Sequence, residues 1–150
     1  MIEGSLNHRS SVIAKASYRA ANRMIHLQCQ RGRPFPSRLT LKMLQFAADQ
    51  GHVPAMSRLG ALLYQWGVGR AVKRSGLEYI RMAAKGGDVE AQYQLGKAYF
   101  EGALTYQNNK AASHWLALAA DRGHPRAADV LYESQRGQAP LEPASITSFT

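Results

Sequence analysis

The chain is poor in the residues that build disulfide frameworks, zinc sites and membrane spans. Its 150 residues include one cysteine, Cys29, so an internal disulfide is excluded and no cysteine pair is present for a zinc site. No apolar run approaches the roughly 20 residues that cross a bilayer. The first residues, "MIEGSLNHRSS", lack the basic and apolar regions of a secretory signal. These absences predict a cytoplasmic protein.

Acidic residues are scarce in the first half of the chain. Residues 1–75 hold 12 Lys and Arg against 2 acids, residues 76–150 hold 7 against 8, and the net charge is +9. A basic half favours association with an acidic partner through long-range attraction. Acidic protein, nucleic acid and an anionic membrane surface are the candidate partners. The alternative interpretation is that these cations only solvate helix faces.

A five-residue pattern recurs three times at a spacing of 36 residues, as "AADQG" at 47–51, "AAKGG" at 83–87 and "AADRG" at 119–123. After each copy, apolar residues follow in phase at steps of four, which is the period of an α-helix and not of a strand. The equivalent positions are Ala55, Ala91 and Ala127, then Leu59, Leu95 and Leu131, then Gly60 and Gly96. Each unit therefore begins with a helix.

A second helix is predicted in front of each Ala pair. Its larger residues are Met43, Tyr79 and Trp115, followed by Phe46, Met82 and Leu118. We expect these to fill the space between helices, while alanine lets helices approach. Gly51, Gly87 and Gly123 fall where a left-handed cap closes a helix, and Gly96 is expected at a close approach of two helices. The unit is a helix, a loop, a helix and a tight turn.

The pattern A-x-x-x-L-G-x-x-x-(Y/F)-x-x-G, then K-A-x-x-x-W-x-x-x-A-A-x-x-G, resembles the Sel1-like repeat, a relative of the tetratricopeptide repeat. One full copy carries it in Ala91, Leu95, Gly96, Tyr99, Gly102, Lys110, Ala111, Trp115, Ala119, Ala120 and Gly123. The resemblance implies an all-α solenoid of stacked antiparallel helix pairs in a right-handed superhelix. Sel1-like proteins are generally adaptors whose concave surface holds a protein partner, so the resemblance implies binding and supplies no catalytic residue.

Three parts are predicted along the chain. Residues 1–37 form a capping helix and a loop, and residues 38–136 form the repeat solenoid. Residues 137–150 contain two prolines and no repeat signal, which predicts a flexible tail. In the capping helix the predicted apolar stripe consists of Val12, Ala16, Ala20, Met24 and Leu27.

Few residues are arranged for chemistry. His26 and Cys29 lie three apart on one helix, but no third group is present to orient them as base and nucleophile. His52 and His124 occupy the helix-start position that Asp88 fills in the intervening repeat. Their spacing is therefore architectural, and no metal site is predicted. The sequence predicts a protein with no enzymatic activity and no cofactor.

The predicted binding site lies on the first helices of the repeats, which usually line the inner surface of a helical superhelix. Its residues are Arg58, Tyr93 and Lys97, joined by Arg19 and Arg23 from the leading helix. Together they are expected to form a basic groove with an aromatic anchor for an acidic protein partner. Among the aromatic residues, Tyr93 and Trp66 fit the buried stripe least well.

Two alternatives stay open at this point. A nucleic-acid-binding module would place the cations of the basic half on phosphates, with a steep dependence of binding on salt. Those cations are Arg9, Lys15, Arg19, Arg23, Arg31, Arg33 and Arg38. A bacterial immunity or inhibitor protein that binds a toxin is a special case of the adaptor.

Overall fold

The computed structural model describes residues 3–30, 36–102 and 106–136, and within these ranges it contains seven α-helices and no strand. The helices are α1 (Glu3–Gln30), α2 (Arg38–Asp49), α3 (Val53–Trp66), α4 (Arg70–Lys85), α5 (Val89–Glu101), α6 (Asn109–Asp121) and α7 (Ala127–Arg136). The predicted all-α solenoid is confirmed. The tail predicted at 137–150 lies outside the described residues. Within those ranges, none of the helices combines the length and hydrophobicity that a membrane span requires.

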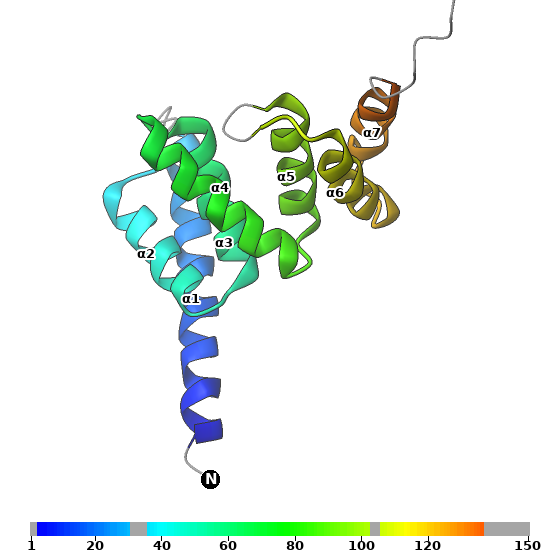
Figure 1. Cartoon of the computed structure of the whole chain (residues 1–150). Helices are drawn as coiled ribbons and strands as arrows, with labels where there is room; N and C mark the ends of the chain where they lie inside the picture. Colours follow the sequence, from blue (N-terminus) through cyan, green and yellow to red (C-terminus); the bar gives the residue numbers. More distant parts are fainter. Residues whose placement is uncertain (1–2, 31–35, 103–105, 137–150) are drawn as a thin grey trace, which may run out of the picture.

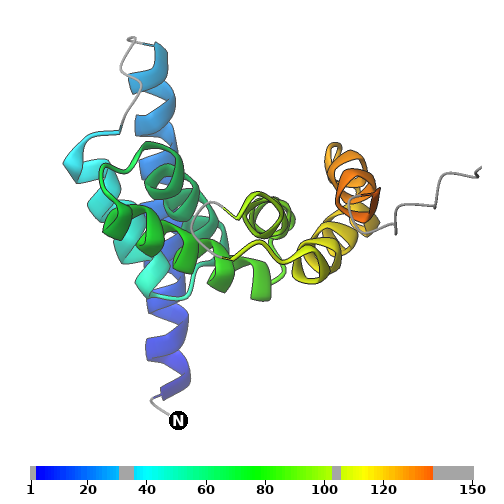
Figure 2. The ribbon, with the colours of Figure 1, turned by 45° about the horizontal axis from the view of Figure 1, so that its top comes forward.

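Successive helix pairs lie side by side, α1 with α2, α3 with α4 and α5 with α6, and α7 follows alone (Figure 1). The first helix of one unit contacts that of the next at α3 with α5 and at α5 with α7, whereas α1 with α3 and the second helices make no comparable contact in the described part of the chain. The first helices therefore form the inner side of the stack. In both views the N-terminal turns of α1 extend beyond the other helices (Figure 2).

Each unit ends in the same glycine-centred turn. Gly51, Gly87 and Gly123 have φ values of +80°, +87° and +81°, so the predicted left-handed caps are confirmed. The residue after each glycine donates its backbone N–H to the carbonyl of the first alanine of the pair, at 3.0 to 3.1 Å. These bonds satisfy carbonyls that the helix end leaves without an intrahelical donor. The same turn thus ends the second helix of every unit.

The residue that closes the turn also caps the next helix. His52 Nδ1 accepts the N–H of Ala55 at 3.3 Å, and Asp88 Oδ1 accepts that of Ala91 at 2.8 Å. Burial, with a smaller Coulombic effect of Lys15, holds the pKa of His52 below its ordinary value of 6.5. Only the neutral imidazole has a free lone pair on Nδ1, so protonation removes the cap.

We expect acidification to destabilise the chain through His52. Because its pKa is lower in the folded state, its contribution is complete above about pH 6.5 and is lost as the pH falls through the folded pKa. The loss is limited to the value of a helix cap, about 1 kcal/mol. His52→Asn keeps an uncharged acceptor, so melting at pH 7.5 and 5 should differ less for this variant than for the wild type. Equal differences would contradict this role of His52.

The core between the two helices of each unit is built on one residue of the second helix. Leu44, Ile80 and Leu116 are 36 residues apart and completely buried. The space-filling role predicted for Phe46 and Met82 is wrong, because these side chains are exposed. A shift of two positions turns a side chain to a different side of a helix, so Phe46 and Met82 leave the contact with the paired first helix.

Glycine in the first helix marks where the paired second helix approaches. A Cβ atom on Gly96 would lie 2.7 Å from Cγ of Leu116, so the close approach predicted there is confirmed. On α7 the equivalent position, 36 residues further on, is the exposed Tyr132. Its side chain would block a second helix from packing on α7 as α6 packs on α5. Within the described residues, α7 is therefore a first helix without a paired second helix.

The stripe predicted to pack α1 against the repeats is wrong. Of its five residues, Val12, Ala16, Ala20 and Leu27 are exposed. The buried side of α1 instead carries Ala14 and Ala21, with Tyr18 and Ile25 partly buried against the same core. Ser17 on this side also donates a hydrogen bond to the carbonyl of Met43 in α2, at 3.0 Å. The packing of α1 therefore uses the side that carries Ala14 and Ala21, and most of the predicted stripe is left exposed.

Candidate partner-binding groove

Three adjoining cavities follow the inner surface between α1, α3 and α5, and Arg58 lines all three. Their volumes are about 580, 240 and 460 Å³. The first two share Ile25 and Cys29, and the last two share Ala61 and Gln65. We call this continuous depression the inner groove. It exists because α1 makes no contact with α3 comparable to that between α3 and α5.

The end of the inner groove between α1 and α3 combines apolar side chains with polar ones around one cation, Arg58. Ile25 and Leu62 are partly buried there, and the indole of Trp66 is 53% exposed. His26 and Cys29 line this end as well. Arg58 is exposed, and within the described residues it forms no ion pair. An unpaired guanidinium beside exposed apolar surface suits a carboxylate that lies next to a hydrophobic side chain.

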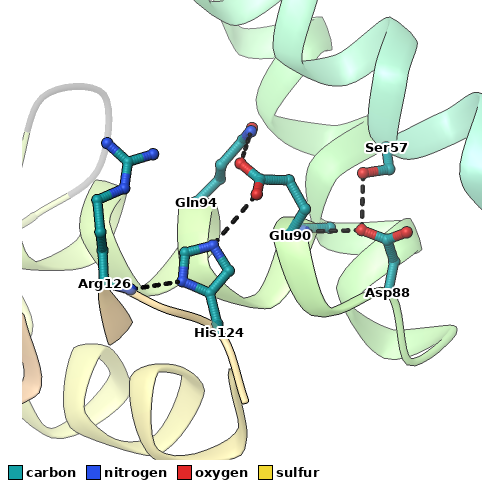
Figure 3. A network of polar contacts seen from close by, with 7 residues as sticks. Ser57, Asp88, Glu90, Gln94, His124 and Arg126 are labelled. Atoms are coloured by element: carbon teal, nitrogen blue, oxygen red, sulfur yellow. Dashed lines mark hydrogen bonds and ion pairs between the residues drawn. The ribbon is translucent and has the colours of Figure 1, made fainter. Parts of the chain in front are cut away.

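The opposite wall of the inner groove, on α5, is held by a network of polar contacts (Figure 3). Ser57 donates its hydroxyl to Asp88 at 2.7 Å, which ties α3 to the start of α5. Glu90 Oε1 accepts from Gln94 at 2.8 Å, and Glu90 Oε2 lies 3.2 Å from Nε2 of His124. The network thus links two successive first helices to the turn that leads into α7.

The hydrogen bonds around His124 define its neutral tautomer. Nδ1 accepts the backbone N–H of Arg126 at 3.4 Å, so Nε2 carries the proton and donates it to Glu90. Burial by itself raises the pKa of Glu90, but hydrogen bonds from Gln94 and His124, with the charge of Arg126 and that of His124 when it is protonated, hold this pKa below 4.5. Glu90 is therefore a carboxylate at neutral pH. The wall on α5 is acidic, so the groove is not uniformly basic.

The exposed position predicted for Tyr93 is wrong. Its side chain is 5% exposed, stacked on the ring of His124 with centroids 4.1 Å apart and with the guanidinium of Arg126 5.3 Å from its ring centre. The neighbouring Gln92 is also buried and donates to the carbonyl of Ala84 at 3.2 Å. α5 contacts α3, α4, α6 and α7, so more of its circumference is covered than one apolar stripe indicates. The exposed aromatic side chain of the groove is Trp66.

The remaining predicted binding residues do not meet in one place. Lys97 is exposed on α5 and pairs with Glu101 at 3.5 Å. Arg19 and Arg23 are exposed on α1, and neither lines the cavities that contain Arg58. Of the five predicted residues, Arg58 alone lines the inner groove.

Only some of the cations assigned to a nucleic-acid interface have side chains that the structure describes. The side chains of Arg9, Arg31 and Arg33 lie outside the described ones, whereas Lys15 and Arg38 are exposed. Arg38 opens α2, and Lys15 lies on α1.

Solved structures with the same arrangement of helices include two bacterial repeat proteins. A protective antigen of uropathogenic Escherichia coli strains, displaying an SLR fold, matches 80% of this chain with a TM-score of 0.69 and 25% identity. A Sel1 repeat protein from Oxalobacter formigenes matches 87% with a TM-score of 0.66 and 23% identity, which shows a shared fold. The chain covers 25% of the first protein and 94% of the second.

Sequence comparison leads to the same repeat. A sel1-like repeat-containing protein of Acanthamoeba polyphaga mimivirus is 40% identical over 47 residues, which is 31% of this chain and 8% of that protein. The family model for the Sel1 repeat matches residues 37–52, 53–88 and 89–124, an uninterrupted stretch of more than half of the chain. Its units begin where α3 and α5 begin and keep the period of 36 residues. The chain belongs to the Sel1 repeat family.

Proposed function

We propose that this protein is a non-enzymatic adaptor that binds an acidic segment of a protein partner in the inner groove. One observation carries the proposal: Arg58 lines all three cavities, and within the described residues it has no carboxylate partner. A carboxylate of the bound segment lies at Arg58. An adjacent apolar side chain enters the cavity lined by Ile25, Leu62 and Trp66.

The acidic groups of the groove favour binding over catalysis. Asp88 caps α5 and accepts from Ser57, and Glu90 is occupied by Gln94 and His124. A general acid or base needs a group free to exchange a proton with a substrate, and these two carboxylates have structural partners instead. Because the α5 wall is acidic, it repels an acidic segment and directs it toward Arg58 and α1. The proposed cytoplasmic location rests on the sequence features given above.

Reversal of the charge at Arg58 tests this proposal. Arg58→Glu is expected to reduce recovery of the bound partner at least about tenfold, because truncating or reversing a charge at a desolvated contact costs 2 kcal/mol or more. The measurement is affinity capture from nuclease-treated lysate of the native host, followed by quantitative mass spectrometry. Melting should be unchanged because Arg58 is exposed.

Arg74→Glu is the matched control. Arg74 is exposed on α4, lines none of the three cavities, and its reversal changes the net charge by the same amount. A partner that depends on the inner groove is lost with Arg58→Glu and retained with Arg74→Glu. If no captured protein distinguishes the two variants, the groove is not the binding site.

A further inference from the structure

The outer surface of α1 carries an apolar stripe beside a row of cations. Ile13, Ala16, Ala20 and Leu27 are separated by three, four and seven residues and are all exposed, which places them on one side of the helix. Ile13 is 55% exposed and Leu27 48% exposed. We call these four residues the α1 seam. Their spacing matches the heptad positions through which one helix packs on another.

The row of cations lies beside the α1 seam and meets it at Arg23, which is three residues after Ala20 and four before Leu27. Lys15, Arg19 and Arg23 are four residues apart and exposed, so they follow one another along the helix surface. None of them has an ion pair within the described residues. A helix that packs on the seam brings its own flanking residues against this row of three cations. Those flanking residues therefore have to be acidic.

We propose that the α1 seam is a second docking surface, separate from the inner groove, and that it binds an amphipathic helix of a partner protein with acidic residues along one flank. Small side chains at Ala16 and Ala20 allow the backbone of that helix to approach closely. Ile13 and Leu27 contact it on both sides of this point. Carboxylates on its flank pair with Arg19 and Arg23.

A membrane surface fits the α1 seam less well than a helix. Interfacial helices insert large apolar residues into the lipid. The seam has two, Ile13 and Leu27, which are 14 residues apart and thus about 21 Å apart along the axis. The two alanines between them add little apolar area, but they remove the steric barrier to a close helix–helix contact.

A second copy of the chain is also disfavoured as the occupant. Residues 4–30 contain no Asp or Glu, so neither a parallel nor an antiparallel pair of α1 helices neutralises the row of Lys15, Arg19 and Arg23. Like charges without a counter-charge destabilise a helix pair. Charge complementarity therefore favours a different chain with acidic flanks.

The test uses two synthetic helical peptides of about three heptads with the same Leu and Ala seam. One carries Glu on the flanking positions and the other carries Lys. The full-length chain is expected to bind the Glu peptide at least about tenfold more tightly than the Lys peptide, measured by fluorescence anisotropy. In the variant with Arg19→Glu and Arg23→Glu the preference should reverse. The Lys15 charge is retained because it influences His52.

Arg70→Glu with Arg74→Glu is the matched control, since these two arginines are also exposed, four residues apart and on a helix, α4. This control and Arg58→Glu should both keep the preference for the Glu peptide. Ile13→Ser with Leu27→Ser should abolish binding of either peptide without lowering the melting temperature.

Two results would overturn the proposal. One is equal affinity of the wild-type chain for both peptides, including no binding to either. The other is a preference for the Glu peptide that persists after reversal of Arg19 and Arg23. Binding of phosphatidylserine vesicles or duplex DNA, tested in parallel, counts against the proposal if it requires Arg19 and Arg23 while the Glu peptide does not.

Discussion

Alanine in place of Gly60 is expected to lower the free energy of unfolding by about 2 to 3 kcal/mol. A Cβ atom at this position would lie 2.8 Å from the backbone nitrogen of Ile80 and 2.9 Å from the carbonyl oxygen of Gly76. Backbone atoms cannot rotate away, so α3 and α4 have to separate. Gly76 on α4 is constrained in the same way by α3, because a Cβ atom on Gly76 would lie 2.6 Å from the backbone nitrogen of Tyr64.

The sign of the change in unfolding free energy for Gly60→Ala shows whether α3 and α4 approach closely at this position. Alanine favours a helix over glycine by about 1 kcal/mol, so without the close approach the variant would be more stable than the wild type. The α3–α4 pair is also the middle pair of the stack, and in a repeat protein the damage spreads to both neighbouring interfaces. Urea unfolding followed by circular dichroism gives the free energy.

Gly96→Ala is the comparison for this prediction. The two nearest atoms there, at 2.7 and 3.1 Å, belong to the side chain of Leu116, although the backbone nitrogen of Leu116 follows at 3.1 Å. A side chain can shift in part, so we expect a smaller loss of stability than at Gly60. A Gly60→Ala variant as stable as the wild type would show that the helices do not approach as described.

Truncation of Ile80 is expected to cost about 3 to 4 kcal/mol, whereas truncation of Met82 on the same helix should cost less than about 1 kcal/mol. Ile80 is 0% exposed and Met82 is 50% exposed. Ile80→Ala removes buried methyl groups from the α3–α4 contact and leaves a cavity. Met82→Ala removes atoms that are already half in water, and alanine is the better helix former.

Urea unfolding of the two variants distinguishes the observed packing from the one expected from the repeat pattern. The pattern assigned the space-filling role to Tyr79 and Met82, and the structure assigns the central position to Ile80. Equal losses for Ile80→Ala and Met82→Ala would contradict the observed packing. The same comparison on α2, with Leu44 and Phe46, should give the same order, because Leu44 is fully buried and Phe46 is 45% exposed.

The residues that line the inner groove were predictable only in part. Arg58 lines the inner groove, as its position on a first helix indicated. Tyr93 is covered by His124, which follows it by 31 residues, and Trp66 supplies the exposed ring instead. No pattern within α5 signals that contact, because the ring that covers Tyr93 belongs to the next repeat. The acidic wall was missed for the same reason, since Glu90 is oriented by His124.

What the sequence by itself determined is the set of local features, and what only the tertiary structure decided is which surfaces are covered. Left-handed glycine caps, helix starts and the period of 36 residues depend on groups a few positions apart, so residues such as Gly87 and Asp88 reveal them directly. The exposed side of α1 depends on where α2 lies against it. Whether a side chain is buried depends on which helices pack around it. The sequence of a single helix does not determine how many helices do so.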